Sequence, residues 1–186
     1  LGLAVLVIEA LVVIFGPYLS PYTFDGQDFN LIGQPGPMGP EHWLGSDELG
    51  RDAFTRLIYG GRVSMLVGLA GAVIATVLGT VVGALSGFYR GWTDTILMRF
   101  TDVMLSIPTL PLVLLLSGLF HPSPPLLVAI VGALIWMGTA RLVRSQFLAL
   151  REREFVEAAR ARGAGGPRLM LRHILPNAIG PITVSA

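Results

Sequence analysis

The sequence predicts an all-α membrane protein, a polytopic bundle of transmembrane helices. Of its 186 residues, 53% are hydrophobic and only 13% are charged, whereas a soluble domain usually has about 25% charged residues. Apolar runs close to the ~20 residues that cross a bilayer as a helix recur along the chain. Polar, Pro-rich and Gly-rich segments separate these runs. We therefore expect a single transmembrane domain over residues 1–186.

The first apolar run, residues 1–16, predicts the first transmembrane helix, and we expect it to be truncated because it opens in mid-segment. A secretory signal peptide is the alternative for such a short run. No small-residue cleavage site follows it, because the chain continues with Gly16, Pro17 and Tyr18, and Glu9 lies in its middle. These features favour the transmembrane helix.

Residues 62–150 are predicted to contain helices two to four. Their most apolar stretches are residues 63–88, 100–120 and 125–148. Residues 177–186 begin a fifth apolar run that stops before it could span a bilayer. We expect the intact protein to contain at least one further helix.

The thirteen basic residues, which are all Arg, predict the orientation. Cytoplasmic loops of membrane proteins are enriched in Lys and Arg. With the N-terminus inside, residues 17–61 form an extracytoplasmic loop and only three Arg fall outside. The reverse orientation would place the other ten outside. Those ten are Arg90, Arg99, Arg141, Arg144, Arg151, Arg153, Arg160, Arg162, Arg168 and Arg172.

Small residues recur every four positions in the second predicted span. Gly79, Gly83 and Gly87, preceded by Gly71 and Ala75, leave one helix face nearly without side chains. Such small-xxx-small spacing allows another helix to approach closely. Static helix packing and a sliding surface in a transporter are both compatible with the pattern.

The third predicted span contains Pro108 and Pro111, which remove backbone donors and predict a kink near residues 106–110. Asp94 and Asp102 lie near the predicted inner turn, where Arg99 and Asp102 have the i,i+3 spacing of a helical ion pair. Glu9 is the one carboxylate that the sequence places within a span. It is interpreted either as facing a neighbouring helix or as a proton relay.

No motif predicts catalysis in this chain. It has no Cys, no nucleotide-binding glycine loop and no nucleophile elbow. His42, His121 and His173 lie in three different loops, so their spacing predicts no metal site. We therefore expect no enzyme activity and no cofactor in this chain, and the net charge of +1 gives no indication of nucleic acid binding.

Residues 151–176 are polar and predict two short helices on the cytoplasmic side. Residues 150–162 favour a helix with a small apolar face of Phe155, Val156 and Ala159. Gly163 is expected to end it, and Pro167 to begin a second helix that Pro176 stops. An amphipathic hairpin on the inner leaflet is one interpretation. A helix docked in the groove of a soluble partner is the other.

The pattern Glu157-Ala158-Ala159-x-x-x-Gly163, followed by Leu175-Pro176, resembles the EAA loop of binding-protein-dependent ABC importer permeases. His173 departs from this pattern, which often has Ile there. Residues 42–62 and residues 87–108 also resemble the C-type permease subunit of dipeptide, oligopeptide and nickel importers, in the expected order.

The resemblance implies the type I ABC importer permease fold, with a cytoplasmic coupling-helix loop, in a bacterial inner membrane. It implies four kinds of partner: a homologous second permease, two cytoplasmic ATPases that bind the ATP, an extracytoplasmic substrate-binding protein and membrane lipid. Glu157 would be the charged contact with the ATPase, Ala158 and Ala159 the close-packed face, and Gly163 the turn. Leu175 and Pro176 would complete the coupling motif. The outer loop, residues 17–61, would face the binding protein.

Import of dipeptides or oligopeptides is the expected function. The same motifs serve importers of nickel or another small solute, so that alternative stays open. Two other hypotheses are a carrier driven by protons through Glu9 and a membrane scaffold without transport. Both leave the EAA-like loop unexplained.

Overall fold

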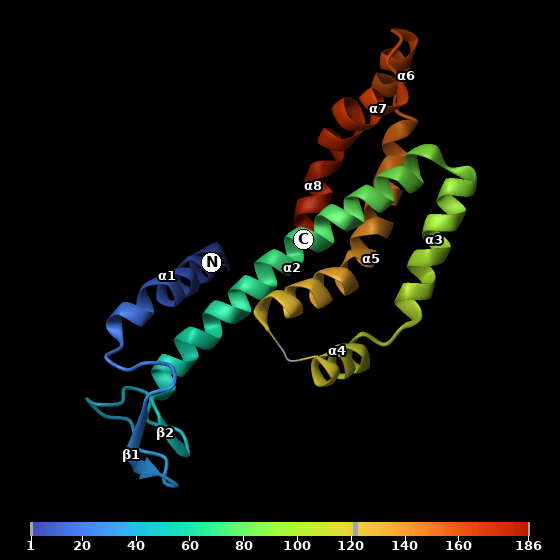
Figure 1. The fold of residues 1–186 in the computed structure, drawn as a ribbon. Coiled ribbons are helices and arrows are strands. Elements are labelled where there is room, and N and C mark those ends of the chain that lie inside the picture. The colour runs from blue at the N-terminus through green and yellow to red at the C-terminus, as the bar shows by residue number, and fades with distance from the viewer. Residues whose placement is uncertain (1, 121–122, 186) are drawn as a thin grey trace. The chain divides into compact units, whose positions relative to one another are not determined.

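The computed structural model describes residues 2–120 and 123–185. They form two compact units divided between Leu66 and Val67, and Figure 1 shows their elements. His121 and Pro122, in the predicted Pro-rich turn, lie outside the described residues. The elements are α1 (Gly2–Leu19), β1 (Gln27–Ile32), β2 (Leu49–Arg51), α2 (Ala53–Tyr89), α3 (Gly91–Ser106), α4 (Thr109–Leu119), α5 (Pro124–Arg151), α6 (Glu154–Ala161), α7 (Gly166–Arg168), the π-helix η1 (Leu169–Ile174) and α8 (Leu175–Ser185).

Three of the described helices, α1, α2 and α5, are long and apolar enough to cross a membrane, and α3 with α4 would make a fourth span. The predicted all-α fold is confirmed, with one small sheet added. Helix α2 begins at Ala53 and not near residue 63. Hydropathy marks only the part of a helix that suits lipid, so the polar first turns escaped the sequence prediction.

The predicted third span is broken and not merely kinked. Helix α3 ends at Ser106, α4 begins at Thr109, and their axes differ by 74°. Ile107 is extended, with φ −79° and ψ 123°, because the residue before a proline avoids the helical region. Pro111 lies in the first turn of α4, where its missing amide would be unpaired anyway. Only Pro108 therefore causes the break.

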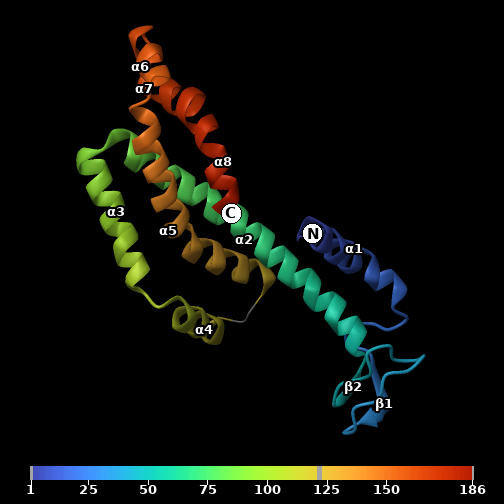
Figure 2. The same cartoon turned by 180° about the vertical axis from the view of Figure 1, so that it is seen from behind.

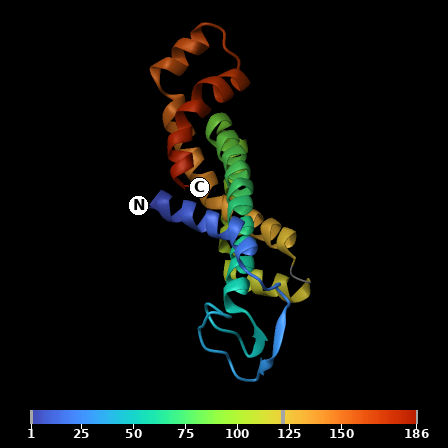
Figure 3. The same cartoon turned by 90° about the vertical axis from the view of Figure 1, so that its left-hand side faces the viewer.

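The outer loop in the first unit is folded. Strands β1 and β2 pair antiparallel, with Gln27 opposite Arg51 and Ile32 opposite Leu49, and both strands can be followed in Figure 3. Residues 33–40 form neither helix nor strand, as predicted. Gly50 has a φ of 69° and its Cα faces the carbonyl of Asp28, so both its backbone angle and its surroundings require glycine.

A buried polar cluster closes this loop against the start of α2. Nδ1 of His42 lies 2.9 Å from one Asp52 oxygen, and the other oxygen accepts hydrogen bonds from the amide and hydroxyl of Thr55, each at 2.7 Å. The Tyr22 ring stacks on His42 at 4.7 Å. Burial raises the pKa of Asp52, but the hydrogen bonds from Thr55 and His42 outweigh it and hold the pKa below its ordinary value.

Replacing Asp52 with Asn should loosen the folded loop by about 1 kcal/mol, because bonds to a charged acceptor become bonds to a neutral one. Since the folded-state pKa is depressed, the native carboxylate stabilises the loop above the ordinary Asp pKa and loses this effect as pH falls through the folded value. The protection factors for hydrogen exchange of residues 27–55, which remove the intrinsic pH dependence of exchange, should therefore fall in acid in the native protein and depend less on pH in Asp52→Asn. Asp25→Asn is the control, because Asp25 is exposed and has no partner among the described residues. Equal behaviour of the two variants would contradict this role of Asp52.

In the second unit, the glycines of α2 lie directly against α5. A Cβ at Gly79 would lie 2.6 Å from Cβ of Thr139, and one at Gly87 would lie 2.7 Å from Cβ of Phe147. At Gly83 it would meet the carbonyl oxygen of Ala140 and, at 2.8 Å, Cβ of Val143. A real Cβ atom at these positions would be too close to α5, so α5 packs on the face that the glycine spacing predicted.

Helices α3 and α8 complete the second unit around α5. Both make contacts with α5, and the two opposite views in Figures 1 and 2 show them running beside it. Phe100 of α3 stacks on Trp136 of α5, with ring centroids 6.1 Å apart. The core of this unit is therefore built around α5, which continues almost directly into α6.

Candidate docking site

Helix α6 exposes six of its eight residues, all except Val156 and Ala159. Arg153 is extended with ψ 147° and separates α6 from α5, which differs from the single helix expected over residues 150–162. Val156 and Ala159 point inward and are fully or almost fully buried. Helical geometry places Glu154, Glu157, Ala158 and Ala161 on the outward face, opposite the buried pair. The exposed Phe155 and Arg160 flank that face.

The turn after α6 is fixed by hydrogen bonds and by Gly163. Gly163 has a φ of 84°, a left-handed angle that glycine adopts without steric cost. The amide of Gly163 donates to the carbonyl of Arg160 at 2.9 Å. The amide of Ala164 donates to the carbonyl of Ala159 at 3.1 Å. This pair of bonds is the Schellman motif that ends many helices. A Cβ at position 163 would meet nothing within 4 Å. Glycine is therefore favoured at this turn by its backbone angle and not by a lack of space.

A buried hydrophobic cluster fastens α6 to the rest of the second unit. Val156 and Ala159 share it with Phe88 of α2, Phe147 of α5 and Ile174 of η1. Phe147, Val156 and Ile174 are completely buried. Each fully buried side chain of this size stabilises packing by roughly 1.5–3 kcal/mol. The outward face of α6 therefore rests on a rigid base.

This burial separates the two alanines of the motif. Ala158 is exposed, as expected for a contact with a partner. Ala159 is only 2% exposed and packs inside the chain's own core, so in this arrangement it supports α6 and does not extend the outward face. Phe155, the third residue of the predicted apolar face, is 39% exposed instead. Val156 and Ala159, which a hairpin on the membrane surface would insert into lipid, are thus buried in the chain's own core.

The sequence predicted that the helix after Gly166 stops at Pro176, but the structure continues it through Pro176. Helix α7 leads into η1, and η1 into α8, which begins at Leu175. The amide of Leu175 bonds to the carbonyl of Met170, five residues earlier. This wider π-type spacing is known to accommodate irregularities in helices, and it occurs where Pro176 removes an amide and its ring would crowd the preceding turn. Leu175 is half-buried and Pro176 is exposed.

A two-point ion pair joins α5 to the first turn of α3, next to the cluster. The guanidinium of Arg144 makes two bonds to Asp94, Nε to Oδ1 at 2.6 Å and Nη2 to Oδ2 at 2.7 Å. Asp94 also accepts a bond from the Ser86 hydroxyl. Two-point Arg–carboxylate pairs are strong and hold both partners in one orientation.

Further contacts lie at the end of α5. Arg151 donates to the carbonyl of Phe88 and lies over its ring at 5.7 Å, while Arg90 pairs with Glu152 at 2.7 Å. Sequence spacing did not identify Arg144 or Arg151 as members of this network, because their partners are 50 and 63 positions away. The sequence signal was only that Arg residues gather at this end of the predicted spans. Asp102 pairs with Arg141 of α5 at 2.6 Å, which corrects the expected pair with Arg99.

The other predicted charged residues are not brought together. Glu9 is exposed on α1 and borders an apolar groove of about 400 Å³ between α1 and the start of α2. His42 is buried in the outer loop and His173 is half-buried in η1. Within residues 2–120 and 123–185, no group of three His, Asp or Glu lies close enough to hold a metal ion.

Three long apolar helices and one broken helix pair define a multi-pass membrane protein. Comparison with known proteins then identifies the family. Residues 79–186 match the family described as binding-protein-dependent transport system inner membrane component. Residues 1–35 match the N-terminal TM domain of oligopeptide transport permease C. The chain belongs to the family of binding-protein-dependent transport system inner membrane components, as the EAA-like loop predicted.

Curated relatives are similar along the whole chain. The oligopeptide transport system permease protein OppC of Haemophilus influenzae is 41% identical over 188 residues, covering 100% of this chain and 60% of the relative. The dipeptide transport system permease protein DppC of Bacillus subtilis is 37% identical, covering 98% of this chain and 57% of the relative. OppC of Escherichia coli is 39% identical over 100% of this chain. The chain thus spans about 60% of the length of these relatives.

Proposed function

We propose that this chain belongs to the permease subunit of an ATP-driven importer of dipeptides or oligopeptides in a bacterial inner membrane. It would form half of the translocation pathway, with a second homologous permease forming the other half. ATP would be bound by two cytoplasmic ATPase subunits, so this chain would need neither an ATPase site nor a cofactor. The observation that supports this proposal most is the exposed face of α6 on a buried, rigid base.

Peptides are the favoured substrate class because the names of the relatives refer to peptide transport. Three relatives with 37–41% identity are named as oligopeptide or dipeptide permeases. Nickel import uses similar coupling motifs but has no support from these names. A proton-driven carrier would need Glu9 near a second polar relay. Among the described residues Glu9 has no hydrogen-bond or ion-pair partner, so that alternative is not favoured.

Docking at α6 would transmit force through packing. A short helix with exposed charge and a small residue, Glu157 beside Ala158, suits a groove in a soluble partner. Because Val156 and Ala159 are buried with Phe88 and Phe147, a displacement of α6 would move the adjoining ends of α2 and α5 with it. Packed cores move as bodies and do not deform continuously. ATP-driven closure of the partners would thereby change access to the pathway.

The test is a pull-down of the tagged, full-length protein from membranes, comparing native Glu157 with Glu157→Lys and identifying partners by mass spectrometry. We expect a second permease and ATPase subunits with the native protein. Charge reversal at a docked contact typically weakens association by several kcal/mol, so the ATPases should be depleted at least tenfold in the variant. Recovery of the second permease should not change, because Glu157 is outside the spans.

Glu48→Lys is the matched control, since it makes the same charge reversal at an exposed carboxylate of the outer loop. It should leave ATPase recovery at the native level. ATPase recovery that is equal with Glu157→Lys and with the native chain would rule out docking through this face. Recovery of the tagged protein alone would instead favour a carrier or a scaffold.

A further inference from the structure

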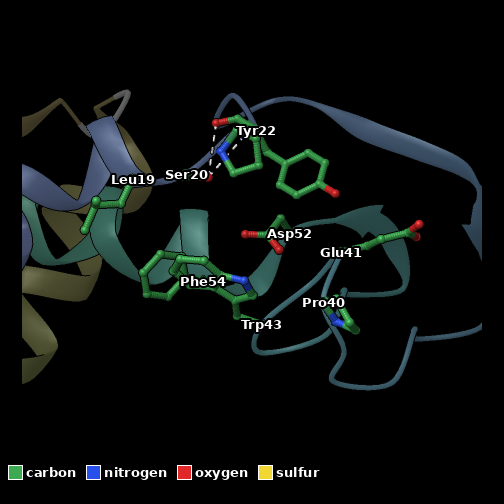
Figure 4. Close-up of a pocket in the computed structure, with 9 residues that line it drawn as sticks. Leu19, Ser20, Tyr22, Pro40, Glu41, Trp43, Asp52 and Phe54 are labelled. Carbon is green, nitrogen blue, oxygen red and sulfur yellow. Dashed lines mark hydrogen bonds between the residues drawn. The ribbon is translucent and has the colours of Figure 1, made fainter.

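The folded outer loop contains a pocket lined by aromatic rings and carboxylates. Figure 4 shows it between the ring of Tyr22 on one side and those of Trp43 and Phe54 on the other, with Asp52 between them and Glu41 at the rim. Its volume is about 260 Å³. The complete lining is Leu19, Ser20, Pro21, Tyr22, Pro40, Glu41, Trp43, Asp52 and Phe54.

The aromatic rings are held in place but remain accessible. Trp43 packs against Phe54 with centroids 5.0 Å apart and is 53% exposed. Tyr22 is positioned by its stacking on the buried His42. The faces of such rings attract cations, most strongly for Trp and more so where water is partly excluded.

Glu41 gives the pocket a negative charge that the loop's arginines do not neutralise, whereas Asp52 is already paired with His42. Arg51 and Arg56 both form ion pairs with Asp47, which is outside the lining. Their Nε atoms lie 2.8 and 3.7 Å from Oδ2 of Asp47. Glu41 has no hydrogen-bond or ion-pair partner among the described residues. Nor does the lining contain an Arg or a His. The bonds from Thr55 and His42 hold Asp52 in its ionised form.

The surface around the pocket has the same sign. Residues 17–61 contain six carboxylates and two Arg, a net charge of −4. Asp25, Glu41 and Glu48 are exposed and unpaired within the described chain. A single small amine would use only the pocket, whereas a protein with a basic surface would gain from both the pocket and the surrounding charge.

From this geometry we infer that the pocket receives a Lys or Arg side chain from the extracytoplasmic substrate-binding protein. The inference rests on the proposed function, taken to include an orientation with residues 17–61 outside and a binding protein that delivers the substrate there. The charged end of such a side chain would lie over the Trp43 ring and meet Glu41, while its aliphatic stem packs against Phe54. Trp43 and Glu41 are then the residues that anchor the binding protein.

The experiment uses the complete transporter in lipid nanodiscs and measures the affinity of its fluorescently labelled binding protein at low and high salt. Trp43→Leu should weaken binding about tenfold, since it removes a cation–π contact and keeps an apolar side chain. Glu41→Gln should weaken it about fivefold at low salt and less at high salt. Trp43→Phe should restore most of the affinity, because a ring face returns.

Glu48→Gln is the control for net charge, because it removes the same charge from the same loop outside the pocket. It should change the affinity less than twofold. Native affinity in both Trp43→Leu and Glu41→Gln would overturn the inference, and so would losses that Glu48→Gln reproduces. An affinity that instead follows the phosphatidylethanolamine content of the nanodisc would also overturn it, in favour of a lipid amine. Co-purification of ATPases with every variant keeps this test separate from that of the proposed function.

Discussion

Gly83→Ala is expected to push α2 away from α5 and to cost at least about 3 kcal/mol, the upper end of the usual range for overpacking. The new methyl group would meet the carbonyl oxygen of Ala140 and, at 2.9 Å, the backbone amide of Arg144. Backbone atoms of a regular helix cannot turn aside as a flexible side chain can. The loss should appear as a lower midpoint of thermal unfolding in detergent and as poor recovery of the full-length protein from membranes.

Gly68→Ala provides the matched control in the same helix. Gly68 is exposed, and a Cβ there would meet nothing within 4 Å. The same substitution should leave stability unchanged or raise it by about 0.5–1 kcal/mol, because alanine favours helix more than glycine does. Similar behaviour of both variants would show that the cost at Gly83 reflects backbone freedom and not packing against α5.

The glycine face was predictable because it depends on helical periodicity, which is visible in one segment of sequence. The buried side of α6 was predicted correctly for Val156 and Ala159, which share one face of a short helix, but not for the exposed Phe155. Helix ends were predicted less well: α2 begins before its apolar run, and α3 begins at Gly91 within the expected turn. Backbone hydrogen bonds decide these ends, and hydropathy does not report them.

Contacts between distant segments could not be predicted from spacing. The sequence paired Asp102 with Arg99 because they are three residues apart, yet packing brings Arg141 of α5 to Asp102. The buried pair of His42 and Asp52 was missed because its two residues are ten apart, in a loop without periodicity. The continuous helix through Pro176 was missed because π-helical spacing has no clear sequence signal.

Arg144→Met is expected to destabilise the second unit by about 2 kcal/mol. Breaking a buried ion pair costs about 3–5 kcal/mol, and losing an exposed ion pair costs about 0–1 kcal/mol. The pair of Arg144 and Asp94 is partly buried, so its cost should lie between these ranges. The side chain of Asp94 is only 19% exposed and would keep one hydrogen bond, from Ser86. Helix α3 should loosen, since Asp94 is its attachment to α5 at this end. Hydrogen exchange should therefore increase in the first turns of α3.

Arg141→Met tests whether burial decides the effect. Arg141 lies one turn earlier in α5, and its pair with Asp102 is about half exposed on both sides, so its loss should cost no more than about 1 kcal/mol. Adding Asp94→Asn to Arg144→Met should recover part of the lost stability, because the unpaired charge is then removed. Equal losses in the two single variants, or no recovery in the double variant, would mean that the pair of Asp94 and Arg144 contributes no more than a surface contact. With the expected result, the attachment of α3 to α5 depends on an ion pair that lies beside the base of α6. A displacement of α6 would then reach α3 as well as α2.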